Sequence, residues 1–232
     1  YYNNPAAPPA LNNPDNVFLI YDTFAVNSFG NYHEGRHLDL HGGGHDNPTY
    51  DAVNRRVNFN TGDNRGGGLC SQGLNERNVL VQCDVAVTGT YPINGTFALS
   101  TKWRNRNNNT LAHISNGDYN SPQIGIDGTR NGVIADPGGN FYFPADGSVH
   151  TFRYASGDIC SFAGLYWVDY YFWVDSVLRA SATWSTEKAN QGGEIAVEAS
   201  QQEGWFDNLL VRRFISPEPT VSQLIEGNTT IN

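Results

Sequence analysis

Hydrophobic and polar residues alternate along much of the chain with the period of two that is typical of β-strands. The clearest example spans residues 78–88. One face of this predicted strand carries the apolar residues Val79, Val81, Cys83, Val85 and Val87. Its other face carries Leu80, Gln82, Asp84 and Ala86. The pattern therefore predicts a strand that turns one face toward a hydrophobic core.

Short segments of the same kind recur between turn signals. We expect further strands at 17–24, 95–103, 123–126, 140–143, 150–154, 165–174, 177–180, 194–199 and 205–214. Asp175 and Ser176 form the predicted turn of a hairpin between two of these strands. The helical candidate is a turn or two near 185–191, ended by Gly192 and Gly193. Many short strands predict an all-β, antiparallel sandwich or barrel.

The strand at 165–174 is aromatic on both faces. One face holds Trp167, Asp169, Tyr171 and Trp173. The other face holds Tyr166, Val168, Tyr170 and Phe172. One of these sets has to be core, and the second set is then free to stack on the apolar face of a sugar ring.

Two observations on this strand point in opposite directions. Across the predicted turn, Trp173 should pair with Leu178, which favours Trp173 toward the core. Phe172 and its face would then lie outward, beside Arg179. The carboxylate of Asp169 favours the opposite orientation, because a buried charge is costly. The sequence leaves both orientations open.

The composition agrees with a β-rich domain. The 232 residues fit one large domain or two small ones, and a hydrophobic fraction of 39% is enough for a core. Glycine is a poor helix former, and its 25 residues argue against a helical bundle, a coiled coil or a parallel α/β fold. No apolar run approaches the roughly 18 residues of a membrane span, so we expect no membrane insertion.

The charge distribution excludes a nucleic-acid surface. The chain has 14 Lys and Arg against 23 Asp and Glu, a net charge of −9, and its basic residues are scattered. An acidic balance fits an extracellular protein, and acidic side chains are ligands for calcium. Methionine is absent even from position 1, which indicates a processed or excised chain.

The sequence holds the three cysteines Cys70, Cys83 and Cys160, and it does not fix their pairing. A Cys70–Cys83 disulfide is the favoured bridge, because these residues lie symmetrically about a predicted turn at 73–78. The alternative is that all three are buried thiols that behave as small hydrophobic residues.

Segments near both ends resemble one family. Three parts of the chain resemble motifs of concanavalin A-like (laminin-G-like) jelly rolls. They are residues 1–5 with the strand at 16–24, residues 150–154 with 172–176, and residues 205–214 with 216–220. In prokaryotic surface proteins such a domain follows a β-domain that ends in a Tyr-Tyr-Gly-Asn-Pro-like segment. Ser176 stands where the family's hairpin usually has glycine. The resemblance spans roughly 16–220 and implies an antiparallel jelly-roll β-sandwich, which we place at 17–216. The Pro- and Asn-rich segment at 1–16 predicts an extended N-terminal arm, and Pro217 and Pro219 mark the start of a C-terminal tail at 217–232.

The same resemblance implies a possible metal ion but no single function. Members of this superfamily include lectins, adhesion modules, glycoside hydrolases and polysaccharide lyases. Many of its jelly rolls hold a structural Ca²⁺ between a carboxylate of an early strand and one of the last strand. Asp22 and Asp207 stand at positions that resemble those two.

Glycosidase chemistry requires two closely spaced carboxylates. The Glu-x-Asp-x-x-Glu motif of hydrolases with this fold does not occur in the sequence. Glu194 and Glu198 share a strand face, but four residues of strand separate them by roughly 13 Å. We interpret them as solvated carboxylates and expect that the protein is not a glycosidase.

Two other kinds of catalytic or metal site have weaker patterns. A lyase needs a base and a cation, and His150 and Tyr154 share a strand face from which Arg153 points away. The strand at 123–125 lacks the histidine of jelly-roll alginate lyases. The residues His33, Glu34, His37, Asp39, His41, His45 and Asp46 are interpreted as a solvated loop, with a divalent-ion site as the alternative.

These patterns favour a non-catalytic extracellular or cell-surface module that binds a polysaccharide or another glycan, or that serves adhesion. The candidate ligand-binding residues are Trp167, Asp169, Tyr170, Tyr171 and Arg179. One alternative is a structural subunit of a surface filament or layer, which assembles with copies of itself through the extended ends. The second alternative is a polysaccharide lyase.

Overall fold

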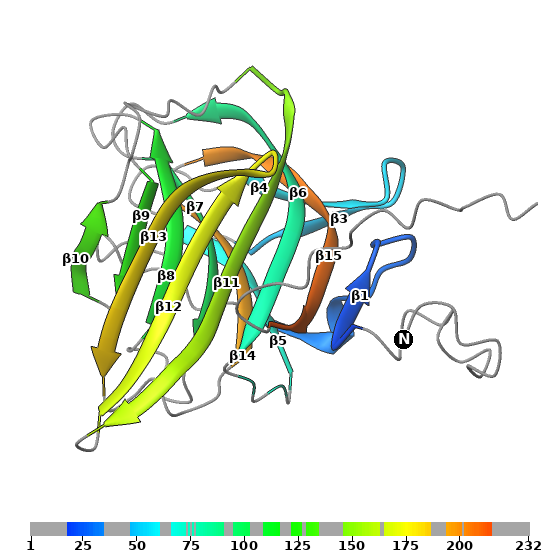
Figure 1. Cartoon of the computed structure of the whole chain (residues 1–232). Helices are drawn as coiled ribbons and strands as arrows, with labels where there is room; N and C mark the ends of the chain where they lie inside the picture. Colours follow the sequence, from blue (N-terminus) through cyan, green and yellow to red (C-terminus); the bar gives the residue numbers. More distant parts are fainter. Residues whose placement is uncertain are drawn as a thin grey trace, which may run out of the picture.

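Two stacked antiparallel β-sheets form the molecule, as Figure 1 shows. The computed structural model describes residues 18–34, 47–60, 66–72, 74, 76, 78–90, 95–102, 109–116, 122–126, 129–134, 146–162, 165–186, 194–200 and 202–214. A single 3₁₀ turn, η3 (Phe29–Asn31), interrupts the strands in this part of the chain. The prediction of an all-β antiparallel fold is confirmed.

The first sheet is eight-stranded and has the order β13-β12-β11-β6-β15-β4-β3, with β1 paired to β15. Its strands are β1 (Ile20–Asp22), β3 (Thr49–Asp51), β4 (Arg56–Asn60), β6 (Val79–Thr90), β11 (Val149–Phe162), β12 (Leu165–Val174), β13 (Val177–Thr186) and β15 (Gln202–Arg213). The first and last strands of the described chain therefore lie side by side in this sheet.

The second sheet is seven-stranded and has the order β10-β9-β8-β7-β14-β5-β2. Its strands are β2 (Tyr32–Glu34), β5 (Gly66–Ser71), β7 (Gly95–Lys102), β8 (Asn109–Asn116), β9 (Pro122–Ile126), β10 (Thr129–Ile134) and β14 (Glu194–Ser200). Every paired strand in both sheets is antiparallel.

The core lies between the two sheets and matches the alternation of the sequence. The inward residues of β6 are completely buried, namely Val79, Val81, Cys83, Val85 and Val87. Aromatic rings fill the space beside them: Phe152 meets Phe172 edge to face with ring centroids 5.6 Å apart, and Phe24 meets Phe206 in the same way.

The β12–β13 hairpin resolves the ambiguity of the aromatic strand. Trp173 pairs with Leu178 as predicted, but a register shift makes Phe172 pair with Ala180 instead of Arg179. Tyr170 and Phe172 are 2% and 1% exposed, so their face is the core face. The orientation inferred from the Trp173–Leu178 pair is therefore wrong, and the orientation that Asp169 favoured is correct.

The expected Cys70–Cys83 disulfide does not form. Both residues are buried free thiols. The segment at 73–78 connects β5 to β6, and these strands belong to different sheets, so it is not a hairpin turn that faces one cysteine with the other. Complete burial raises the pKa of the Cys83 thiol, and the charges of Asp84 and Asp207 add to the effect. The side chain of Cys160 lies outside the described residues.

The interpretation of Glu198 as a solvated carboxylate is also wrong. Glu194 and Glu198 share the outer face of β14 as expected, yet Glu198 is only 1% exposed. Its side chain lies over Gly68 of β5, where an added Cβ would come within 2.8 Å of the Glu198 Cγ. The outer face of β14 is therefore covered at this point.

Several predictions fall partly or wholly outside the described residues. These are the arm at 1–16, the tail at 217–232, the strand at 140–143 and most of the histidine-rich loop. Of the helical turn predicted near 185–191, Ser185 and Thr186 instead belong to β13. Among the described residues, no helix is long and apolar enough to cross a membrane.

Candidate functional site

A small apolar cluster lies on the face of the eight-stranded sheet that points away from the core. We call it the outer-face cluster, and its members are Leu80, Ala155, Tyr171, Trp173 and Phe214. They come from β6, β11, β12 and, for Phe214, the position directly after β15, and the sheet order brings these strands together. Tyr171 and Trp173 remain partly exposed, so the cluster reaches the protein surface.

The aromatic rings of this cluster are ordered by mutual contact. Tyr171 and Trp173 stack with centroids 5.5 Å apart and an interplanar angle of 21°. Tyr171 also meets Phe214 at 5.8 Å. From the neighbouring strand, the Arg153 guanidinium carbon lies 5.0 Å from the centroid of the Trp173 ring, within the range of a cation–π interaction.

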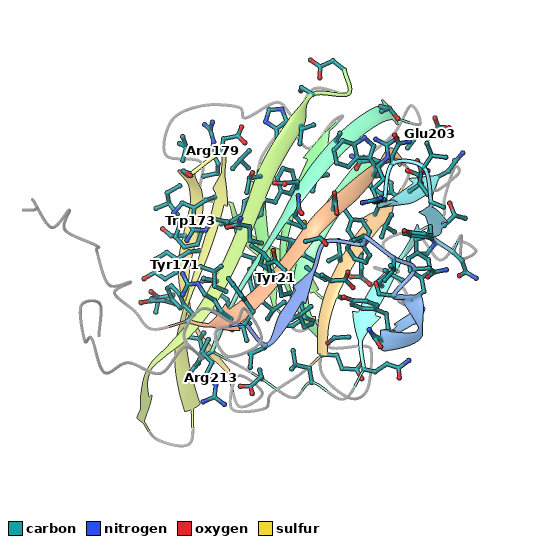
Figure 2. All side chains as sticks on the ribbon, turned by 90° about the vertical axis from the view of Figure 1, so that its right-hand side faces the viewer. Tyr21, Tyr171, Trp173, Arg179, Glu203 and Arg213 are labelled. Carbon is teal, nitrogen blue, oxygen red and sulfur yellow. The ribbon has the colours of Figure 1, made fainter. Side chains whose placement is uncertain are left out.

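Polar groups border the cluster along the hairpin. The Asp169 carboxylate accepts hydrogen bonds from the Tyr171 hydroxyl at 3.2 Å and from the Thr183 hydroxyl at 2.6 Å. Figure 2 shows Tyr171, Trp173 and Arg179 in succession along this hairpin. A partly exposed apolar surface is therefore flanked by a carboxylate and by guanidinium groups.

The structure brings together part of the predicted ligand-binding set. Asp169, Tyr171 and Arg179 belong to the same hairpin. Tyr171 is a member of the cluster, Asp169 accepts its hydroxyl, and Arg179 follows Trp173 along the hairpin in Figure 2. Tyr170 does not, because its side chain is in the core. The side chain of Trp167 lies outside the described residues, although its backbone pairs with Ser185.

Sequence reasoning missed several residues of this surface, including Trp173 and Arg153. Trp173 shares the Tyr171 face by simple alternation, so the correct orientation of β12 would have identified it. Arg153 lies opposite Trp173 in the β11–β12 register. The sequence gives no signal for that pairing, since it depends on how two separate strands align.

The lyase residues do not converge. Tyr154 is completely buried in the core, whereas Arg153 lies on the opposite face of β11 against Trp173. His150 is near the start of the same strand, on the Tyr154 side of it. A base and a cation that face one substrate atom are therefore not available from these residues.

The two predicted metal ligands lie in one neighbourhood with a third carboxylate. Asp207 pairs with Asp84 across β15 and β6. Partial burial raises the pKa of Asp207, and the negative charges of Asp84 and Asp22 raise it further. The Asp84 carboxylate accepts hydrogen bonds from the Thr151 hydroxyl at 2.8 Å and from the Asn208 side-chain amide at 2.9 Å.

Local donors occupy the Asp22 carboxylate. One of its oxygens accepts the Phe24 amide, and the other accepts the hydroxyls of Ser28 and Tyr32. Calcium needs six to eight oxygen ligands, and no group of three or more His, Cys, Asp or Glu within the described ranges forms a metal site. Calcium at Asp22 and Asp207 stays a prediction, and a melting temperature unchanged by EGTA would exclude it.

A second tryptophan–arginine pair lies on the same sheet. The Arg56 guanidinium carbon is 4.7 Å from the Trp205 ring centroid, and Arg56 also contacts Asp51 at 3.4 Å. Hydrogen bonds from the side chain and backbone of Asn54 lower the pKa of Asp51 to about 2. Here the guanidinium is held by the carboxylate of the β3–β4 hairpin.

Comparison with known proteins gives matches in structure but not in sequence. No family model and no curated protein matches the chain. A β-glucanase of Bacillus licheniformis is 13% identical with a TM-score of 0.53, over 84% of this chain and 97% of its own. A chain from work on endo-acting O-glycanases of the human gut microbiota is 12% identical with a TM-score of 0.58, over 85% and 100%.

A third match is an immunostimulatory antigen and pseudo β-1,3-glucanase of Mycobacterium tuberculosis, 12% identical with a TM-score of 0.54, over 85% of this chain and 99% of its own. At such low identity the likeness concerns the fold alone. It confirms the predicted antiparallel jelly-roll β-sandwich.

Proposed function

We propose that this chain is an extracellular or cell-surface module that binds a polysaccharide or another glycan without cleaving it. The ligand surface includes the outer-face cluster and its polar border at Asp169, Arg153 and Arg179. The identity of the ligand will distinguish adhesion from other glycan recognition.

The stacked and partly exposed Tyr171–Trp173 pair is the observation that carries this proposal. Sugar rings present apolar C–H groups together with hydroxyls that both donate and accept. A site for them combines apolar and aromatic walls with a few placed polar groups. The cluster supplies the aromatic carbon, Asp169 supplies an acceptor, and the two arginines supply donors.

The fold supports the same class of ligand without selecting the chemistry. Structural neighbours of this chain are named as a β-glucanase, as O-glycanases and as a pseudo β-1,3-glucanase. The fold of this chain therefore occurs both in proteins named as glycan-cleaving enzymes and in a protein named as a pseudo-enzyme. The choice of binding over cleavage depends on this chain's own residues, and its sequence lacks the Glu-x-Asp-x-x-Glu motif.

A glycan array followed by titration of the best ligand tests the proposal. Asp169→Asn and Arg179→Ala should each weaken binding about tenfold, which is roughly 1.4 kcal/mol. Arg213→Ala is the matched control, because the Arg213 side chain is 74% exposed, contacts Glu76 and lies at the opposite end of the sheet from Arg179 in Figure 2. This control should bind like the unchanged chain.

Melting temperatures of all three variants separate a lost contact from a lost fold. Absence of binding to every glycan on the array contradicts the proposal, and so does equal weakening by the Arg213→Ala control. Release of unsaturated uronate from a bound polymer would instead support the lyase alternative.

A further inference from the structure

A serine, a histidine and an aspartate form a continuous hydrogen-bonded chain where β11 begins and the β12–β13 hairpin turns. The Ser148 hydroxyl oxygen lies 2.9 Å from His150 Nε2. On the other side of the ring, His150 Nδ1 lies 2.6 Å from Asp175 Oδ2. The order hydroxyl, imidazole, carboxylate is the arrangement of a serine nucleophile, its general base and the group that orients the base.

The carboxylate fixes which nitrogen of the ring carries the proton. An ionised Asp175 can only accept, so Nδ1 is the donor to it. In the neutral imidazole Nε2 is then the acceptor, and it faces the Ser148 hydroxyl. The ring is therefore held in the tautomer that can take a proton from the serine.

Asp175 itself is held on both sides by the fold. Its second oxygen accepts the Thr151 amide at 2.9 Å, and its own amide donates to the Thr151 carbonyl at 2.9 Å. Partial burial opposes ionisation, but hydrogen bonds from His150 and Thr151 outweigh it and lower the pKa of Asp175. The hairpin turn thus presents an ionised carboxylate to His150.

We propose that Ser148 and His150 form a serine acyl-transfer site, positioned by Asp175, that hydrolyses esters of small carboxylic acids. This activity goes beyond glycan binding and does not depend on it. Ser148 is exposed, and the side chains of His150 and Asp175 are 20% and 49% exposed, so a small ester reaches the hydroxyl. The chemistry requires no metal or cofactor.

In the reaction the Ser148 oxygen bonds to the ester carbonyl carbon while His150 Nε2 takes the hydroxyl proton. The bond from that carbon to the alcohol oxygen then breaks, and the imidazolium returns the proton to the leaving alcohol. Water attacks the acyl-serine by the same route, which releases the carboxylic acid and restores Ser148.

Asp146 should slow the acylation of Ser148. Its carboxylate accepts the Ser148 amide at 2.8 Å, and the Ser148 hydroxyl and amide together lower the pKa of Asp146. The carboxylate therefore competes with His150 for the hydroxyl proton. It also engages a backbone N–H that could otherwise stabilise the negative oxygen of the intermediate. Asp146→Ala should speed acylation several-fold.

Labelling by a fluorophosphonate probe and hydrolysis of p-nitrophenyl acetate test the proposal on the full chain. Peptide mapping should find the label on Ser148, and Ser148→Ala should abolish it. His150→Ala should slow labelling about a hundredfold. Ser176→Gly is the matched control, since it removes a nearby exposed hydroxyl at a position with φ of 66° that glycine adopts readily.

Asp175→Asn separates a positioning role from a purely structural one. It should lower the hydrolysis rate and alter its pH profile. Ser148→Ala decides the question even if the His150 or Asp175 variants fail to fold, because its hydroxyl is on the surface. The proposal is overturned if the Ser148→Ala variant is labelled as fast as the unchanged chain. It is also overturned if the unchanged chain shows no labelling.

Discussion

The two faces of β12 carry neighbouring aromatic residues with different environments. On the inner face, Tyr170 and Phe172 are buried among core residues from both sheets. On the outer face, Tyr171 and Trp173 pack against a much smaller group and stay partly exposed. The residue types are alike, so the environment and not the side chain separates the two roles.

This contrast shows where the molecule has apolar surface available for a ligand. The inner rings have no access to solvent, and their contribution is to stability. The outer rings are ordered by each other, by Phe214 and by Arg153, which leaves part of their carbon surface open. A surface that is already ordered loses less conformational entropy when it binds a ligand.

The largest expected effect is on the inner face. Phe172→Ala should lower the free energy of unfolding by about 3–5 kcal/mol, because it leaves a cavity beside Phe152. Tyr171→Ala, one residue away on the outer face, should lower it by only about 1 kcal/mol. Urea titrations of both variants measure the difference, and equal losses would contradict the assignment of the faces.

Sequence patterns predicted the strands with clear alternation, because alternation is a local property, but they did not predict β2 to β5, β8 or β10. The β6 pattern identified five buried residues from Val79 to Val87 correctly. The register shift in the β12–β13 hairpin is not local, since it depends on how the two strands twist and pair. That one irregularity moved Arg179 out of the predicted pair with Phe172. The orientation of Trp173 was wrong for a different reason, because its partner Leu178 is itself 41% exposed and does not face the core.

Contacts between distant segments could not be predicted for the same reason. Ser148 and His150 are close in sequence, but Asp175 reaches them only through the pairing of the turn with Thr151. Likewise, Cys70 and Cys83 are close in sequence but belong to different sheets. Residues far apart in sequence can therefore be in contact, and residues close in sequence can lie in different sheets. The sheet order decides which contacts form.

The next prediction concerns binding by the outer face. Trp173→Ala should weaken glycan binding at least tenfold, because it removes the larger ring of the stacked pair. Trp205→Ala is the matched control, since Trp205 also lies under an arginine on the same sheet but outside the outer-face cluster. Calorimetric titration of both variants checks this. If only the Trp205 variant loses glycan binding, the ligand surface lies on the β3–β4 side of the sheet instead.

A smaller effect is the coupling between Arg153 and Trp173. A double-mutant cycle with Arg153→Ala and Trp173→Ala should give an interaction energy of about 0.5–1 kcal/mol in unfolding experiments. The same cycle between Arg153 and Trp205 should give none, because each of these residues stacks with a different partner. A coupling near zero in the first cycle would mean that the guanidinium does not stabilise the ring.

The smallest expected effect is a pH-dependent change in melting temperature caused by the charge of Asp207. No such change is expected from the uncharged inner face of β12. Burial and the charges of Asp84 and Asp22 raise the pKa of Asp207 in the folded chain. A raised pKa favours folding below the ordinary value of about 3.9, and this advantage is lost as the pH rises through the folded-state pKa. Asp207→Asn removes the penalty at neutral pH and still accepts the Asn208 amide. Its melting temperature should therefore exceed that of the unchanged chain by about 1–2 °C at neutral pH and match it in acid. A gain of the same size at both pH values would show that the charge of Asp207 is not the cause.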